Sequence, residues 1–149
     1  MPNYHRASTQ RAEDWARFDR AMDTIMTNIE ASYALYRYRR ESLQSYQAHM
    51  YRHHYRPQDI LSFKTQHESA MYDAFKLIRR AKNTINNAMH MHFPDRYRRI
   101  CSPGEIRAYA STGARVRYEN EIAHARDDIA RADALLAGVD EALRSAEML

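Results

Sequence analysis

The fold is decided by residues 8–56, which read STQRAEDWARFDRAMDTIMTNIEASYALYRYRRESLQSYQAHMYRHHYR. This stretch contains no proline or glycine, and its apolar residues recur at seven-residue steps. One heptad position holds Trp15, Met22, Ile29, Tyr36, Leu43 and Met50, and its partner position holds Phe18, Ile25, Ser32, Arg39, Tyr46 and His53. Such a repeat is typical of a long helix that packs lengthwise against other helices. The helix would be on the order of 70 Å long, and Pro57 should stop it.

A second helix is predicted over residues 59–92, ending before Pro94. Its expected buried stripe consists of Ile60, Phe63, Met71, Ala74, Ile78, Ala81, Ile85 and Ala88. The alanines in this stripe would let another helix approach closely. Because the connection through Pro57 is short, the first two helices should form an antiparallel hairpin.

A third helix is predicted over residues 103–148, after a basic loop at 94–102 with the sequence PDRYRRICS. The run Ser102-Pro103-Gly104-Glu105 has the features of a helix start, with a serine cap, a proline in the first turn and a capping-box glutamate. Ser111-Thr112-Gly113 can separate residues 103–111 as a fourth, short helix. The predicted fold is therefore all-α: one domain, residues 1–149, forming an elongated antiparallel bundle of three long amphipathic helices with coiled-coil-like packing.

The composition agrees with this fold class. Only 3 glycines and 4 prolines occur in 149 residues, too few for the tight turns of an all-β protein. The single cysteine, Cys101, excludes an intrachain disulfide and fits a reducing compartment. No apolar run approaches the roughly 20 residues of a membrane span. We therefore expect a soluble, cytoplasmic protein with no membrane contact, located in the host cytoplasm if it is phage-encoded.

Charge is distributed unevenly along a chain whose net charge is +4. Residues 1–56 carry a net charge of +3, residues 57–102 carry +4, and residues 103–149 carry −3. One interpretation is that the acidic last third neutralises the basic part within the bundle. The other is that an unbalanced basic face meets an acidic partner.

An arginine- and tyrosine-rich tract in the first helix is the strongest functional signal. Arg37, Tyr38, Arg52 and Tyr55 fall near one exposed strip of this helix. Exposed aromatic rings interleaved with arginine are typical of single-stranded nucleic-acid sites, where bases stack on rings and guanidinium groups meet phosphates.

Folding the hairpin about Pro57 would bring two basic clusters together, because residues whose numbers add to about 114 would then lie level. We call the resulting set the basic belt; it consists of Arg37, Arg39 and Arg40 on the first helix and Lys76, Arg79, Arg80 and Lys82 on the second. The belt would serve an acidic partner, or it would be neutralised by Glu119 and Glu121 if the third helix passes at that height. The loop residues Arg96, Arg98 and Arg99 form a second basic site, which could reach a partner or cap helix C-termini.

Metal binding and catalysis have little support in the sequence. His49 and His53 share a helix face and the hairpin register brings His67 near them, so three imidazoles could converge on zinc, but no carboxylate or thiol completes the set. No phosphate-binding glycine loop, Gly-x-Ser-x-Gly or His-Glu-x-x-His motif is present. We therefore predict no metal, no cofactor and no enzymatic activity.

Two classes of function remain. The leading prediction is a non-enzymatic accessory protein of a larger assembly, whose basic belt contacts nucleic acid or an acidic protein surface. The alternative is a protein-directed coiled-coil adaptor, inhibitor or homo-oligomeric structural protein of phage or mobile-element type, without nucleic-acid binding. Its working surface would be the helix seam of Trp15, Phe18, Met22 and Ile25. In size and composition the chain is similar to small basic helical proteins of phage and nucleoprotein assemblies.

Overall fold

The computed structural model of the chain describes the backbone of residues 2–92 and 112–147, and the side chains of residues 13, 16, 17, 19–88 and 119–146. Three helices make up this part of the chain: α1 (Pro2–Arg52), α2 (Pro57–His92) and α5 (Thr112–Glu147). They pack against one another, and the described residues contain no strand. The prediction of an all-α helical bundle is confirmed.

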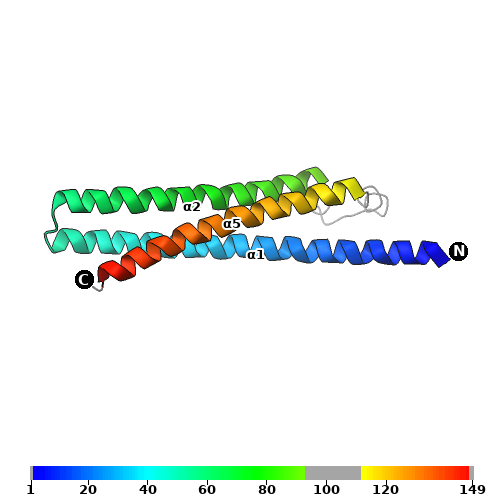
Figure 1. Cartoon of the computed structure of the whole chain (residues 1–149), viewed down its shortest axis with the longest axis horizontal. Coiled ribbons are helices and arrows are strands. Elements are labelled where there is room, and N and C mark those ends of the chain that lie inside the picture. Colours follow the sequence, from blue (N-terminus) through cyan, green and yellow to red (C-terminus); the bar gives the residue numbers. More distant parts are fainter. Residues whose placement is uncertain (1, 93–111, 148–149) are drawn as a thin grey trace.

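The bundle is a long rod (Figure 1). α1 and α2 lie side by side as an antiparallel hairpin, and α5 crosses them obliquely, running in the same direction as α1. With 51 residues, α1 is about 76 Å long, and its N-terminal end reaches past α2 (Figure 1). None of the described helices combines the length and the apolar character that a membrane crossing needs.

The turn between α1 and α2 differs from the prediction, because α1 ends at Arg52 rather than at residue 56. The amide of Tyr55 donates to the carbonyl of Met50 at 3.1 Å, and the amide of His54 donates to that of Tyr51 at 3.3 Å. These are the two hydrogen bonds of a Schellman motif, with His54 as its left-handed residue at φ 56°. The chain therefore leaves the helix before Pro57, and that proline begins α2 instead.

The core contains most of the stripes predicted for the first two helices, together with a stripe of α5. The first helix contributes Met22, Ile25, Ile29, Leu43 and Met50, all at most 4% exposed. The second contributes Met71, Ile78 and Ile85 together with three alanines, and the third contributes the following buried residues: Ile122, Ala125, Ile129, Ala132, Leu136, Val139 and Leu143. The second heptad series of α1 becomes polar toward its end, and His53 there is exposed.

α2 and α5 share the most extensive of the three helix interfaces. Ala74, Ala81, Ala125 and Ala132, on the facing sides of these helices, are completely buried. Because an alanine side chain is a single methyl group, two helices lined with it can approach closely. The role predicted for the alanines of the second helix, Ala74 and Ala81 among them, agrees with the packing.

Some predictions fall on residues that the structure does not describe. These are the loop 94–102, the capping run from Ser102 to Glu105, and the short helix over residues 103–111. α5 is described from Thr112, within the break predicted at residues 111–113.

Candidate functional site

The two parts of the basic belt lie next to each other along the hairpin. Tyr36 packs on Phe75 at 5.3 Å between ring centroids, and Tyr46 packs on Phe63 at 5.0 Å. Facing residues in α1 and α2 therefore have numbers that add to about 110, against the expected 114. This register places Arg37–Arg40 roughly one and a half to two and a half turns from Arg79. The belt is thus a band along the rod, rather than a ring at one height.

Asp128 on α5 pairs with one member of the belt, Arg80. Arg80 donates from Nε to Oδ2 of Asp128 at 2.8 Å and from Nη2 to Oδ1, which makes the pair bidentate. The side chain of Asp128 is only 8% exposed, so the guanidinium supplies the charge that a buried carboxylate needs. The hydrogen bond to Asp128, and then its charge, raises the pKa of Arg80.

A second member of the belt is also neutralised from α5. Arg39 Nη1 lies 2.8 Å from Oδ1 of Asp140, and both side chains are less than 20% exposed. Asp140 also pairs with Arg144 of its own helix at 3.0 Å. Arg39 and Arg80 are therefore structural, because each holds α5 against the hairpin.

The predicted counter-charges were the wrong residues. Ser32 donates to Asp133 at 2.8 Å, and Arg39 pairs with Asp140, so neighbours in α1 and α5 are 101 residues apart. This register places Glu119 and Glu121 beside residues 18–20 of α1, away from the belt. Asp128 and Asp140 stand at the belt instead, because α5 runs parallel to α1 and reaches the belt with its second half (Figure 1).

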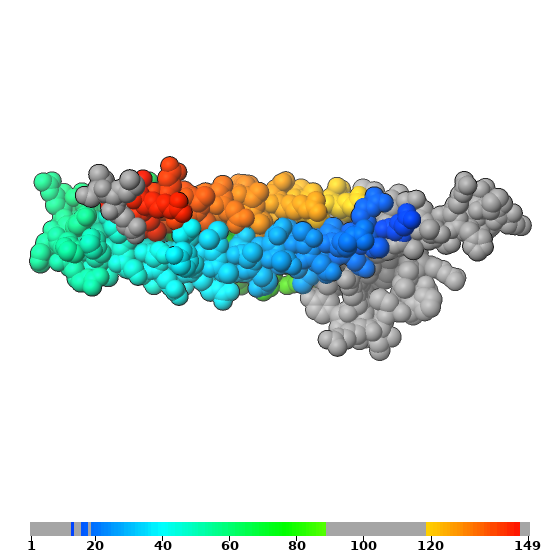
Figure 2. All heavy atoms as spheres, turned by 90° about the horizontal axis from the view of Figure 1, so that it is seen from below, coloured from blue at the N-terminus to red at the C-terminus, as the bar shows by residue number. Residues whose placement is uncertain are grey.

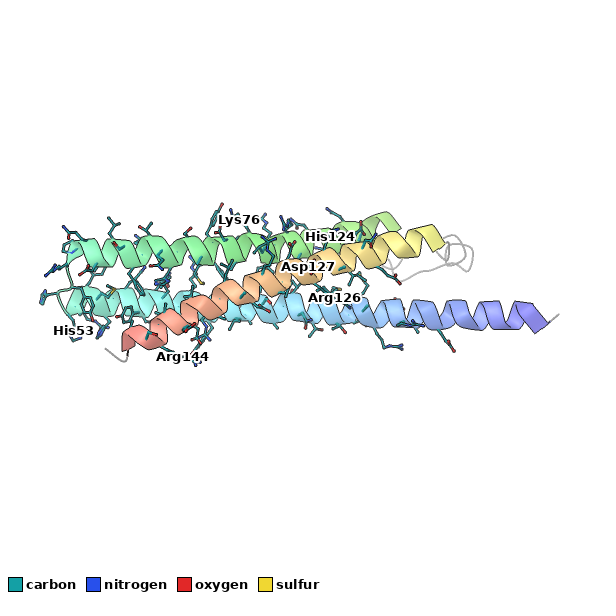
Figure 3. The ribbon with its side chains drawn as sticks, in the orientation of Figure 1. His53, Lys76, His124, Arg126, Asp127 and Arg144 are labelled. Atoms are coloured by element: carbon teal, nitrogen blue, oxygen red, sulfur yellow. The ribbon has the colours of Figure 1, made fainter. Side chains whose placement is uncertain are left out.

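The other members of the belt remain available. Arg37, Arg40 and Arg79 are exposed, and none forms an ion pair with a carboxylate of the described segments. Lys76 and Lys82 are about half exposed and make only loose pairs, with Asp73 at 3.5 Å and Glu30 at 3.9 Å. Figure 3 shows Lys76 on the outer side of α2, pointing away from α1. Pairs of this kind hold a lysine weakly in water.

Exposed tyrosines accompany these cations. Tyr38 is 60% exposed, as the sequence predicted for the strip of α1. Tyr55 is 40% exposed but lies beyond the end of α1 at Arg52, so its predicted place on the helical strip is wrong. Tyr72 on α2, 61% exposed, was not predicted. Its ring lies 4.7 Å from Lys76 Nζ. The signal that could have identified it is the spacing Tyr72-x-x-x-Lys76, which places both side chains on one face of a helix.

Tyr38 and Tyr55 line the same surface groove. It lies along the last four turns of α1, and Tyr46, His49 and Ala146 also line it. The turn after α1 folds Tyr55 back, so that its ring lies 6.3 Å from that of His49. Figure 2 shows the C-terminal end of α5 lying against this end of α1. Arg52, also exposed, lies two heptads after Tyr38 on the same helix face.

The three candidate histidines do not form a metal site. His49 and His53 are neighbours, with ring centroids 4.2 Å apart. His67 is buried instead against Phe63 at 4.4 Å, and this burial lowers the pKa of its imidazole. The shift of register explains the difference, because it places Phe63 rather than His67 beside this part of α1. Within the described residues, no three side chains of His, Cys, Asp or Glu are grouped to hold a metal ion.

The remaining candidates are only partly described. Met22 and Ile25 of the proposed seam are 2% and 1% exposed and belong to the chain's own core. The side chains of Trp15 and Phe18 lie outside the described ones, as do residues Arg96, Arg98 and Arg99.

Comparisons of the chain with protein-family models, with curated proteins and with solved structures give no match.

Proposed function

We propose that this protein is a non-enzymatic nucleic-acid-binding component of a larger assembly. The observation that carries the proposal is the coincidence of exposed arginines that form no ion pair with the described residues, Arg37, Arg40 and Arg79, with exposed tyrosines on the same helices. Arginines supply the phosphate contacts that dominate affinity for nucleic acid. Tyrosine rings supply stacking surfaces for bases.

The internal ion pairs support this assignment. Among the described residues, the belt cations that α5 pairs with its carboxylates are Arg39 and Arg80, while Arg37, Arg40 and Arg79 keep their charge toward solvent. Like charges on adjacent helices repel one another unless an external anion lies between them. A phosphate backbone running along the band would relieve that repulsion.

The adaptor alternative has less support. Half of its proposed seam, Met22 and Ile25, is buried in the intramolecular core. A partner helix could therefore use only the N-terminal part of α1, which reaches past α2 (Figure 1).

The test is a titration of labelled single- and double-stranded DNA and RNA, followed by fluorescence anisotropy at low and physiological salt. Wild-type protein is compared with Arg37→Glu/Arg79→Glu. The matched control, Arg20→Glu/Arg126→Glu, changes the net charge equally at exposed positions outside the belt. Arg80 is left intact, because reversing it would leave the buried Asp128 facing a like charge.

We expect micromolar or tighter binding that weakens steeply with salt. The belt variant should bind at least tenfold more weakly and have a shallower salt dependence, by about one unit of slope for each phosphate that the protein no longer neutralises. The control should bind nearly as tightly as wild type. Absence of binding to every nucleic acid, or equal weakening in the two variants, would overturn the proposal.

A further inference from the structure

We propose that the groove along the last turns of α1 receives unpaired bases, so that the nucleic acid bound is single-stranded. This inference rests on the proposed function and specifies its ligand. The residues that carry it are Tyr38, Tyr46, His49 and Tyr55, with Glu41 at the rim.

The aromatic side chains of the groove differ in how far they are exposed to solvent. Tyr46 and His49 are partly buried and stack on each other, with ring centroids 5.7 Å apart and planes at 27°. Tyr38 and Tyr55 stand at its edges and are 60% and 40% exposed. Planar rings at the floor and the edges match the faces of planar bases, and each stacked base contributes about 1–3 kcal/mol in single-strand binding proteins.

The charges around the groove favour nucleic-acid bases over cationic ligands, which aromatic sites can also bind. A cage of tyrosines with a carboxylate can also hold a quaternary ammonium group. Here, however, Arg37, Arg40 and Arg52 are exposed on the same helix as the groove, and none of them forms an ion pair with a carboxylate of the described segments. The surroundings therefore repel a cationic ligand and attract an anionic polymer.

Glu41 favours the entry of bases into the groove over the entry of phosphates. Its carboxylate, exposed at the rim, repels phosphates but can accept hydrogen bonds from the amino and imino groups of bases. The backbone of the strand would then follow the arginines, with the bases turned inward.

The bases of an intact duplex cannot stack on these tyrosines, because their planar faces are covered by neighbouring base pairs. Only the edges of the bases are exposed in the grooves of the duplex. From Tyr38 to His49, α1 rises about 16 Å. That length accommodates a few nucleotides of a single strand. The structure thus combines a stacking platform with a flanking cationic band.

The test uses a mixed-sequence single strand of about a dozen nucleotides and the corresponding duplex, with the full chain. Tyr38→Leu/Tyr55→Leu removes the exposed rings of the groove. Tyr51→Leu is the control, because Tyr51 is 65% exposed on the same helix and does not line the groove, and it is compared with Tyr38→Leu alone. Tyr38→Phe/Tyr55→Phe keeps the rings and removes only the hydroxyls. Circular dichroism establishes that each variant is folded.

We expect the leucine variant of the groove to bind the single strand at least tenfold more weakly, with unchanged duplex affinity. The phenylalanine variant and the Tyr51→Leu control should retain single-strand affinity, whereas Tyr38→Leu alone should weaken it. If the groove variants leave single-strand binding unchanged while Arg37→Glu/Arg79→Glu weakens it, the groove assignment is wrong and the proposed function stands. If wild-type protein binds no nucleic acid, both fail.

Discussion

At the scale of single residues, His54 shows how the hairpin turn is made. It adopts φ 56°, in the left-handed region that costs a residue with a Cβ about 1–2 kcal/mol. Glycine is the usual residue at this position of a Schellman motif. The accompanying contact between Tyr55 and His49 offsets part of the strain, and it also closes one end of the aromatic groove.

Replacing His54 with glycine should therefore stabilise the protein. His54→Gly removes the steric strain but adds entropy to the unfolded chain, so we expect a net rise of about 0.5–1 kcal/mol in the free energy of unfolding. Urea denaturation followed by circular dichroism measures it. His53→Gly is the control, because His53 lacks a positive φ and should gain nothing. A less stable His54→Gly variant would contradict this account of the turn.

At the scale of helices, α5 is held by two different kinds of contact. Its alanines allow close packing on α2, while Asp128, Asp133 and Asp140 reach residues of both other helices. The alanines set the distance between helices without specifying a register, because a methyl group fits at many positions. The three carboxylates each have a defined partner, so they select one register of α5 among several that the apolar stripe permits.

Enlarging a buried alanine of α5 should separate the helices. Ala132 is 0% exposed, whereas Ala130, two residues earlier, is exposed. Ala132→Leu should lower the free energy of unfolding by about 1–3 kcal/mol through overpacking. Ala130→Leu, with the same change of composition, should stay within about 0.5 kcal/mol of wild type. Chemical denaturation of the two variants in parallel measures the difference, and equal stabilities would show that α2 and α5 do not approach closely at Ala132.

At the scale of the whole molecule, the rod carries its excess positive charge on the hairpin of α1 and α2 and its excess negative charge on α5. The basic hairpin is neutralised from within by the acidic α5, and the remaining positive charge lies on the outward sides of α1 and α2. An extended shape spreads these charges along one axis, so a linear polyanion can contact several of them at once.

The extended shape itself can be tested by small-angle X-ray scattering of the monomer. A rod as long as α1, about 76 Å, has a radius of gyration of about 22 Å, whereas a compact protein of 149 residues has one of about 15 Å. We expect a value near the larger figure, with the monomer mass confirmed by light scattering. A value near 15 Å would mean that the helices fold back on themselves.

The sequence by itself determined the helices and their buried faces. Heptad spacing predicted the core from Met22 to Met50 and the buried alanines of α2, because burial along a helix repeats with the helical period. It also identified Arg37, Tyr38 and Tyr55 as exposed. The point where α1 ends could not be predicted, since a left-handed histidine has no sequence signal comparable to glycine.

Only the tertiary structure decided which residues from different helices meet. A register error of a few residues moved His67 away from His49, and the path of α5 replaced Glu119 and Glu121 by Asp128 and Asp140 as partners of the belt. The groove likewise depends on the fold, because Tyr38, Tyr55 and Ala146 come from three parts of the chain. The physical reason is that the register of the hairpin is set by its turn at residues 53–56, which an unforeseen helix end placed before Pro57. The register of α5 is set by polar contacts between particular residues, which the apolar stripe does not specify.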